Sequence, residues 1–129
     1  MPLDESHYPS DWVRIAEKDF LRVKRLLDID DPNAAGFYLQ QSVEKFLKAF
    51  LLKSGWRLRK IHDLEALLNE AIKFSPSLER YRSICQKISG FYLIERYPLL
   101  VEGGLYESDV TEALPEVEHL IRDVLDYLK

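Results

Sequence analysis

The most apolar stretch of the chain, residues 33–55, predicts a helix that is apolar almost all the way round. Its polar positions form only a narrow strip, which consists of Gln41, Glu44, Lys45 and Lys48. A helix with so little polar surface is normally surrounded by other helices. We therefore expect this segment to be the centre of a bundle, capped by Asn33 and ended by Gly55 in the left-handed conformation.

Four further segments repeat apolar residues at the three- and four-residue spacing of a helix. We expect helices over residues 12–27, 63–74, 76–92 and 108–128. Ser10 and Ser75 are placed to cap the first and third of these, and Pro115 should kink the last or separate its first turn. No segment alternates like a strand, so the predicted fold is all-α, an antiparallel up-and-down helical bundle of four long helices plus a shorter fifth.

Two stretches fall outside the expected helices. Residues 1–9 are expected to form a loose N-terminal arm, and the connection from Ile94 to Ser108 is the longest irregular segment. A connection of that length in a compact bundle is often functional. The whole chain, 1–129, is expected to be one domain, because this length is enough to bury a single core.

Composition and charge are typical of a soluble cytoplasmic protein. The chain is 47% hydrophobic and 31% charged, and no apolar run has the length of a membrane span. The one cysteine, Cys85, excludes an internal disulfide and lies in an apolar helical stripe, which predicts a buried thiol. The formal net charge of −4 argues against a generic nucleic-acid binder.

The polar residues complete no common catalytic or metal-binding motif. The three histidines lack a second His or Cys at ligand spacing, so we expect no metal. The chain has no G-x-S-x-G, P-loop or G-x-G-x-x-G pattern, and we expect no cofactor. His62 and Asp63 are predicted to start a helix, where the carboxylate accepts bonds from free backbone N–H groups. General acid–base work by His62 is the alternative.

Three short motifs nevertheless follow one another along the chain. The first is Gln40-Gln41-x-x-Glu44-Lys45-x-Leu47-Lys48-Ala49, the second is Lys60-Ile61-His62-Asp63-Leu64, and the third is Arg96-Tyr97-Pro98. Together they resemble the HEPN domain, whose name stands for "higher eukaryotes and prokaryotes nucleotide-binding". The resemblance covers nearly the whole chain, and it implies a helical bundle more specifically than it implies a function.

Many HEPN domains resemble metal-independent ribonucleases with an R-x(4–6)-H motif near the end of a late helix. Two such helices meet in a dimer, where the histidine moves the proton of the attacking 2′-hydroxyl and the arginine stabilises charge on the phosphate. The matching arginine here is Arg96, but residues 101–103 are Val101, Glu102 and Gly103. A ribonuclease would therefore need a divergent site that combines Arg96 with His62 or Glu102.

Small stand-alone HEPN proteins also resemble the partners of minimal nucleotidyltransferases in toxin–antitoxin or stress-related modules. The same bundle resembles the C-terminal domain of kanamycin-type nucleotidyltransferases. This resemblance implies a non-catalytic nucleotide-binding module that homodimerises and pairs with a separate nucleotidyltransferase. RNA is a partner only under the ribonuclease alternative, no membrane partner is expected, and a structural or adaptor bundle is the third hypothesis. The residues expected to bind ligand or partner are Gln41, Lys45, Lys48, His62, Asp63, Arg96 and Tyr97.

Overall fold

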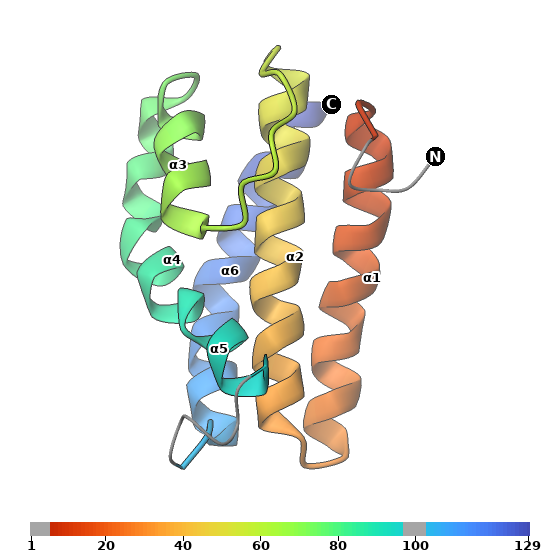
Figure 1. Cartoon of the computed structure of the whole chain (residues 1–129), viewed down its shortest axis with the longest axis vertical. Helices are drawn as coiled ribbons and strands as arrows, with labels where there is room; N and C mark the ends of the chain where they lie inside the picture. Colours follow the sequence, from red (N-terminus) through yellow and green to blue (C-terminus); the bar gives the residue numbers. More distant parts are fainter. Residues whose placement is uncertain (1–5, 97–102) are drawn as a thin grey trace.

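The computed structural model describes residues 6–96 and 103–129, without the side chains of residues 95 and 96. Every secondary-structure element in these residues is helical, which confirms the all-α prediction. In chain order the elements are α1 (Pro9–Asp28), α2 (Pro32–Lys53), α3 (Leu64–Ile72), the 3-10 helix η2 (Pro76–Tyr81), α4 (Arg82–Ser89), α5 (Phe91–Arg96) and α6 (Glu107–Leu128) (Figure 1).

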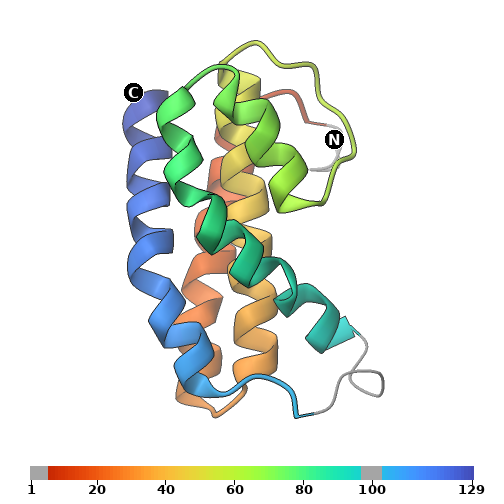
Figure 2. The ribbon, with the colours of Figure 1, turned by 90° about the vertical axis from the view of Figure 1, so that its left-hand side faces the viewer.

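The elements run up and down along one long axis (Figures 1 and 2). α1 and α2 are antiparallel neighbours, the path from η2 to α5 runs back in the direction of α1, and α6 returns in the direction of α2. α3 is a short additional helix that packs against α2, η2 and α4. This arrangement places α2 in contact with α1, α3, α5 and α6, so α2 is the central helix, as its sequence predicts.

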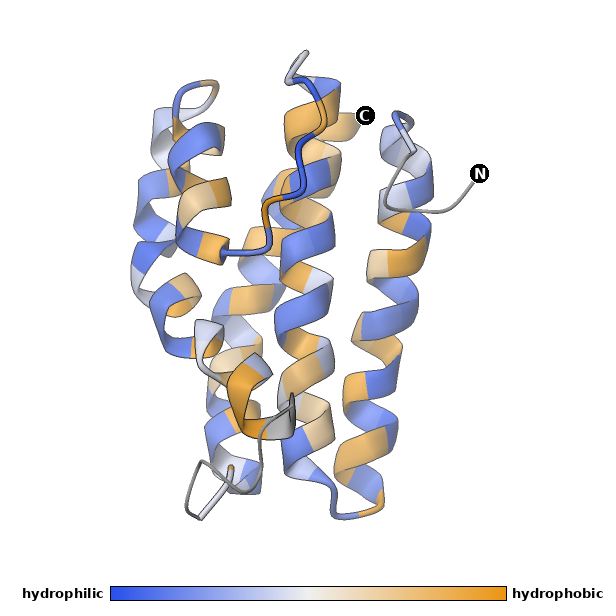
Figure 3. Ribbon diagram, viewed as in Figure 1, coloured by the Kyte–Doolittle hydropathy of each residue, from blue (hydrophilic) through white to orange (hydrophobic). Residues whose placement is uncertain are grey.

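The core is built mainly on α2. Figure 3 shows apolar positions (orange) recurring along each long helix between polar ones (blue). The large side chains that α2 buries completely are Leu39, Val43, Phe46, Leu47, Phe50 and Leu51. Each such side chain contributes about 1.5–3 kcal/mol of hydrophobic stabilisation. The predicted polar strip is only partly exposed, because Glu44 is 4% and Lys48 2% accessible to solvent.

The start of α2 differs from the prediction. The N-cap is Asp31, whose carboxylate accepts a hydrogen bond of 3.2 Å from a backbone N–H in the first turn. Pro32 explains the shift, because proline fits the first position of a helix. Asn33 lies inside the first turn, and its Oδ1 accepts a hydrogen bond of 2.7 Å from the backbone N–H of Leu105. At the other end, Gly55 has φ +96°, which confirms the predicted left-handed stop.

The start of α1 also differs from the prediction. The N-cap is Tyr8, and Ser10 lies inside the first turn rather than before it. A proline at the first helical position again accounts for the earlier start. Within the predicted N-terminal arm, Ser6 is buried and its hydroxyl donates a hydrogen bond of 2.7 Å to Asp11. Residues 1–5 lie outside the part of the chain that the structure describes.

The helix predicted over 76–92 is divided into η2, α4 and α5, so the expectation of four long helices is wrong in this segment. Gly90 separates α4 from α5, and just before it the Ser89 hydroxyl donates a hydrogen bond of 2.6 Å to the carbonyl of Cys85. Such side-chain bonds compete with the backbone ladder of a helix. The predicted inner face is nevertheless buried at Leu78, Tyr81, Cys85 and Ile88.

The last helix is continuous. α6 begins at Glu107, one residue before Ser108, and Pro115 lies inside it without separating a first turn. α5 shortens the irregular connection predicted from Ile94, and residues 97–102 of that connection are outside the described residues. None of the described helices combines the length and the apolar character that crossing a membrane requires.

Candidate functional site

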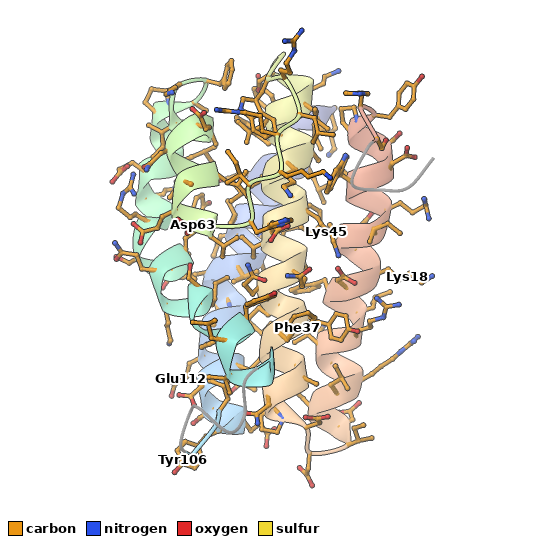
Figure 4. The ribbon with its side chains drawn as sticks, viewed as in Figure 1. Lys18, Phe37, Lys45, Asp63, Tyr106 and Glu112 are labelled. Carbon is orange, nitrogen blue, oxygen red and sulfur yellow. The ribbon has the colours of Figure 1, made fainter. Side chains whose placement is uncertain are left out.

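A hollow of about 460 Å³ opens on the side of α2 that faces the start of α3 and the junction of α4 and α5. Figure 4 labels Phe37 on α2 and Asp63 directly before α3, and both residues border the hollow. Hollows that combine apolar walls with a few convergent polar groups are the usual form of a ligand site. The polar part of the lining includes Gln40, Gln41, Glu44, His62 and Asp63.

Glu44 is the buried charged group of this hollow. Its Oε2 accepts a hydrogen bond of 3.1 Å from Nζ of Lys48, one helical turn further along α2. The same oxygen lies 3.1 Å from Nδ1 of His62. Its Oε1 is buried and has no hydrogen-bond partner among the described residues. Because buried polar atoms are nearly always hydrogen-bonded, this oxygen is a position where a ligand donor is expected.

Lys48 belongs to the structure behind the hollow rather than to its lining. The ammonium group is buried with Glu44 and lies 5.1 Å from the ring centroid of Trp12 on α1. The carboxylate and the ammonium therefore balance each other's charge inside the bundle, and the indole adds a cation–π contact. What remains for a ligand at Glu44 is hydrogen-bond capacity rather than unbalanced charge.

His62 stands at the mouth of the hollow. Its side chain is 73% exposed, and Glu44 holds one ring nitrogen. When the neutral imidazole donates from Nδ1 to that carboxylate, its Nε2 is left with a free lone pair. Asp63, the next residue, caps α3 by accepting a hydrogen bond of 3.2 Å from a backbone N–H, which confirms the predicted helix start. The arrangement gives the hollow an imidazole nitrogen at its edge that can accept a proton.

Two neighbouring amides on α2 line the hollow. Nε2 of Gln41 donates a hydrogen bond of 2.7 Å to Oε1 of Gln40. This bond orients the Gln40 amide so that its Nε2 remains as a donor. Gln40 and Glu44 are four residues apart and therefore lie on the same face of the helix, one turn from each other. A donor and an acceptor thus stand side by side along α2.

Aromatic rings form a further part of the wall. The rings of Phe37 on α2 and Tyr92 on α5 are stacked, with centroids 5.6 Å apart and planes 28° apart. Tyr38 meets Phe37 edge to face at 5.2 Å, and Arg22 of α1 lies 5.2 Å from the Tyr38 ring. Aromatic rings of this kind suit planar partners, since they pair with other flat π systems in offset-stacked or edge-to-face arrangements.

The structure brings together three of the residues predicted to bind ligand or partner, which are Gln41, His62 and Asp63. Two others are held elsewhere. Lys45 pairs with the buried carboxylate of Asp19 on α1, which also pairs with Arg22, and Lys48 pairs with Glu44. The structure does not describe the side chains of the remaining predicted residues, Arg96 and Tyr97. It also does not describe Glu102, which the ribonuclease alternative combines with Arg96.

Sequence reasoning missed four residues of the site. Gln40 and Glu44 lie within the first motif, but the apolar pattern places Glu44 only in the narrow polar strip of α2. The signal that could have found it is its spacing of four from both Gln40 and Lys48 on a helix that is largely apolar. Phe37 and Tyr92 carried no local signal, because they come from helices whose contact depends on the fold.

Comparison with protein families adds an identification to this geometry. Residues 9–127 match the family model described as the HEPN domain. The chain belongs to the HEPN family. Comparison with curated proteins and comparison with solved structures each found no match. The motif resemblance is thus confirmed over almost the full length of the chain.

The hollow of this HEPN domain combines hydrogen-bonding groups and aromatic rings with an exposed imidazole, that of His62. No group of three or more His, Cys, Asp or Glu side chains in residues 6–96 and 103–129 is arranged to hold a metal ion. The hollow provides a carboxylate oxygen, amide groups and an aromatic face. These groups can hold a flat, polar molecule, and His62 can accept or donate a proton at its edge.

Proposed function

We propose that this HEPN domain is a non-catalytic nucleotide-binding module that forms a homodimer and pairs with a separate minimal nucleotidyltransferase. A toxin–antitoxin or stress-related system is the setting that the family resemblance favours. Residues 101–103 supply no histidine for the ribonuclease motif of the family. The partner then provides the metal and the nucleotide chemistry, and this chain provides a shaped binding surface.

The observation that carries the proposal is the hollow itself. It combines a stacked aromatic pair, Phe37 and Tyr92, with a buried carboxylate oxygen of Glu44 that lacks a hydrogen-bond donor among the described residues. A nucleobase has the matching properties, because it is flat and carries hydrogen-bonding groups on its edge. Stacking of a base on an aromatic side chain contributes about 1–3 kcal/mol.

The charge of the adjoining loop supports an anionic ligand. Arg57 and Lys60 are exposed on the connection that leads to His62, and neither has an ion-pair partner among the residues that the structure describes. Arg59 in the same loop pairs with Glu70 of α3 and lies 5.4 Å from the Trp56 ring. Two exposed cations on the loop that leads to the hollow favour a phosphate-bearing molecule over a neutral one.

The direct test is nucleotide binding by the purified full chain, measured by isothermal titration calorimetry. We expect saturable binding of a nucleoside monophosphate, weakened at least tenfold by Phe37→Leu, which removes the stacking face but keeps an apolar side chain. Leu21→Ala, at an exposed apolar position of α1 away from the hollow, is the matched control and should bind normally. Absence of binding to every nucleotide would reject the proposal.

Assembly is tested separately. Sedimentation equilibrium should give twice the chain mass of 15.2 kDa, and co-expression with a candidate minimal nucleotidyltransferase should yield a complex that survives gel filtration. A strictly monomeric chain without affinity for such an enzyme would reject the partner part of the proposal. It would leave an adaptor bundle, the third hypothesis, as the remaining explanation.

A metal-independent ribonuclease is the second candidate function. The contact between Glu44 Oε2 and His62 Nδ1, at 3.1 Å, favours it, because a carboxylate that holds one imidazole nitrogen orients the other as a general base. RNA cleavage in EDTA that is lost in both His62→Ala and Arg96→Ala would establish this activity. Absence of cleavage by the unchanged chain would exclude it and leave the binding module.

A further inference from the structure

We propose that Glu44 reads an amino group on the bound base, so that the hollow prefers nucleobases with an exocyclic amino group over those with a carbonyl at the same position. This inference rests on the proposed function and specifies its ligand. It concerns Glu44 Oε1, the buried acceptor that has no donor among the described residues.

The two oxygens of Glu44 have different surroundings. Oε2 accepts from Lys48 and contacts His62, both at 3.1 Å, so its hydrogen-bonding capacity is used inside the protein. Oε1 is the oxygen of Glu44 that has no donor among the described residues, and Glu44 is part of the lining of the hollow. A carboxylate oxygen cannot donate, so it is satisfied by an N–H group and is opposed by a carbonyl oxygen. A base with a carbonyl in this place would leave two acceptors facing each other.

The charge balance around Glu44 favours a neutral amino group over an ammonium group. Lys48 is buried beside the carboxylate and already compensates its charge. A second cation would enter a region where the carboxylate is neutralised and where exposed Arg57 and Lys60 lie on the adjoining loop. The requirement at Oε1 is therefore a hydrogen bond, which the amino group of a base supplies without added charge.

Gln40 completes the recognition pattern. Its Oε1 accepts from Gln41, which leaves Nε2 as a donor one helical turn from Glu44. On adenine and on cytosine an exocyclic amino group is adjacent to a ring nitrogen that accepts a hydrogen bond. The acceptor on Glu44 and the donor on Gln40 match this pair, while the stacked rings of Phe37 and Tyr92 provide the flat wall beside it.

A matched pair of ligands tests the inference without any mutation. AMP and IMP share the purine frame, the ribose and the phosphate, but AMP carries an amino group where IMP carries a carbonyl. We expect AMP to bind the full chain at least tenfold more tightly than IMP in calorimetric titrations, because a site with a buried acceptor discriminates strongly against a ligand that leaves it unpaired. CMP should likewise bind more tightly than UMP.

A variant then assigns the preference to Glu44. The double substitution Glu44→Gln with Lys48→Met removes both buried charges together, which avoids leaving an unpaired lysine in the core. Because an amide at position 44 can donate as well as accept, we expect the ratio of AMP to IMP affinity to fall to within about twofold. Glu112→Gln, an exposed carboxylate on α6 that Figure 4 labels, is the control and should retain the preference.

Each other outcome overturns the inference in a recognisable way. Equal affinity for AMP and IMP overturns amino-group recognition while leaving nucleotide binding intact. A preference that persists in the double variant shows that another group reads the base. Binding of arginine amide in place of any nucleotide would show that the hollow takes a protein side chain. Absence of all nucleotide binding removes the proposed function together with this inference.

Discussion

At the scale of single residues, the chain combines an apolar interior with a few buried charged groups that form ion pairs, within one helix or between two. Asp19 on α1 is 1% exposed and pairs with Lys45 and Arg22. Glu44 and Lys48 form a second buried ion pair within α2. Buried charges of this kind are costly when one partner is removed, because the other remains desolvated.

Lys48→Ala is therefore expected to destabilise the fold strongly. It leaves the Glu44 carboxylate buried, with His62 as its one remaining polar contact among the described residues, and the expected loss is about 3–5 kcal/mol of unfolding free energy. Urea denaturation monitored by circular dichroism measures this loss. Lys18→Ala is the control, since Lys18 is exposed on α1 and should change stability by less than about 0.5 kcal/mol. A loss below 1 kcal/mol for Lys48→Ala would contradict the buried-pair description.

Cys85 allows a prediction about pH. Burial raises the pKa of its thiol from 9.0 to about 12, so the native protein keeps the neutral thiol where the unfolded chain ionises. The unfolded state then binds fewer protons than the native state between pH 9 and 12, and unfolding becomes easier as pH rises through this window. Denaturation at pH 8 and pH 10.5 should show a larger loss of stability for the unchanged chain than for Cys85→Ala. An identical loss of stability in both proteins would contradict the assignment of this pH dependence to the Cys85 thiol.

At the scale of elements, the N-terminal part of α2 packs against the segment before α6 and is hydrogen-bonded to it. Asn33 accepts the backbone hydrogen bond of Leu105, and the Leu105 side chain packs directly on Gly36. A side chain at position 36 would also lie 3.2 Å from the Phe91 ring on α5. The glycine therefore serves close packing of three segments, which outweighs its low helix propensity.

Gly36→Ala and Gly90→Ala should have opposite effects. The first adds a methyl group where Leu105 and Phe91 leave no room, and we expect a loss of about 1–3 kcal/mol in spite of the better helix propensity of alanine. In the second, the added methyl group has no atom within 4 Å, and Gly90 has helical dihedral angles. We therefore expect a gain of about 0.5–1 kcal/mol in unfolding free energy. Thermal unfolding by circular dichroism compares the two. A stabilised Gly36→Ala variant would refute the close packing.

At the scale of the whole molecule, the hollow exists only because three distant parts of the chain meet. α2 supplies its polar floor, the loop before α3 supplies His62 and Asp63, and α5 supplies Tyr92. Local unfolding of any one of these parts would remove the site. The ligand can therefore bind only the folded chain. The stability that the chain gains when ligand is added then measures binding.

A nucleotide that binds as proposed should stabilise the folded chain. At a free concentration 100 times its dissociation constant, the expected gain is about 2.7 kcal/mol, seen as a rise of the melting temperature in calorimetry. Phe37→Leu, with binding weakened tenfold, should gain only about 1.4 kcal/mol at the same concentration, because stacking on this ring is part of the binding energy. An equal rise in both proteins would show that the ligand binds elsewhere.

The sequence by itself determines which faces of the helices are buried. Apolar spacing correctly predicts α1, α2, α3 and α6 and the inner faces of η2 and α4, because helical periodicity is a local property. It does not reveal the division of the segment from η2 to α5. A glycine such as Gly90 leaves the apolar pattern uninterrupted, so the break arises from local bonds that the pattern does not record.

The site shows the same division between local and tertiary information. The Gln40-Gln41-x-x-Glu44 motif and the His62-Asp63 pair are visible in the sequence, and they carry the family resemblance. Only the tertiary structure decides that Glu44 is buried, that one of its oxygens contacts His62, and that the other has no donor among the described residues. The physical reason is that such contacts join residues far apart in the chain, and their geometry follows from how the helices pack rather than from the spacing of residues along any one of them.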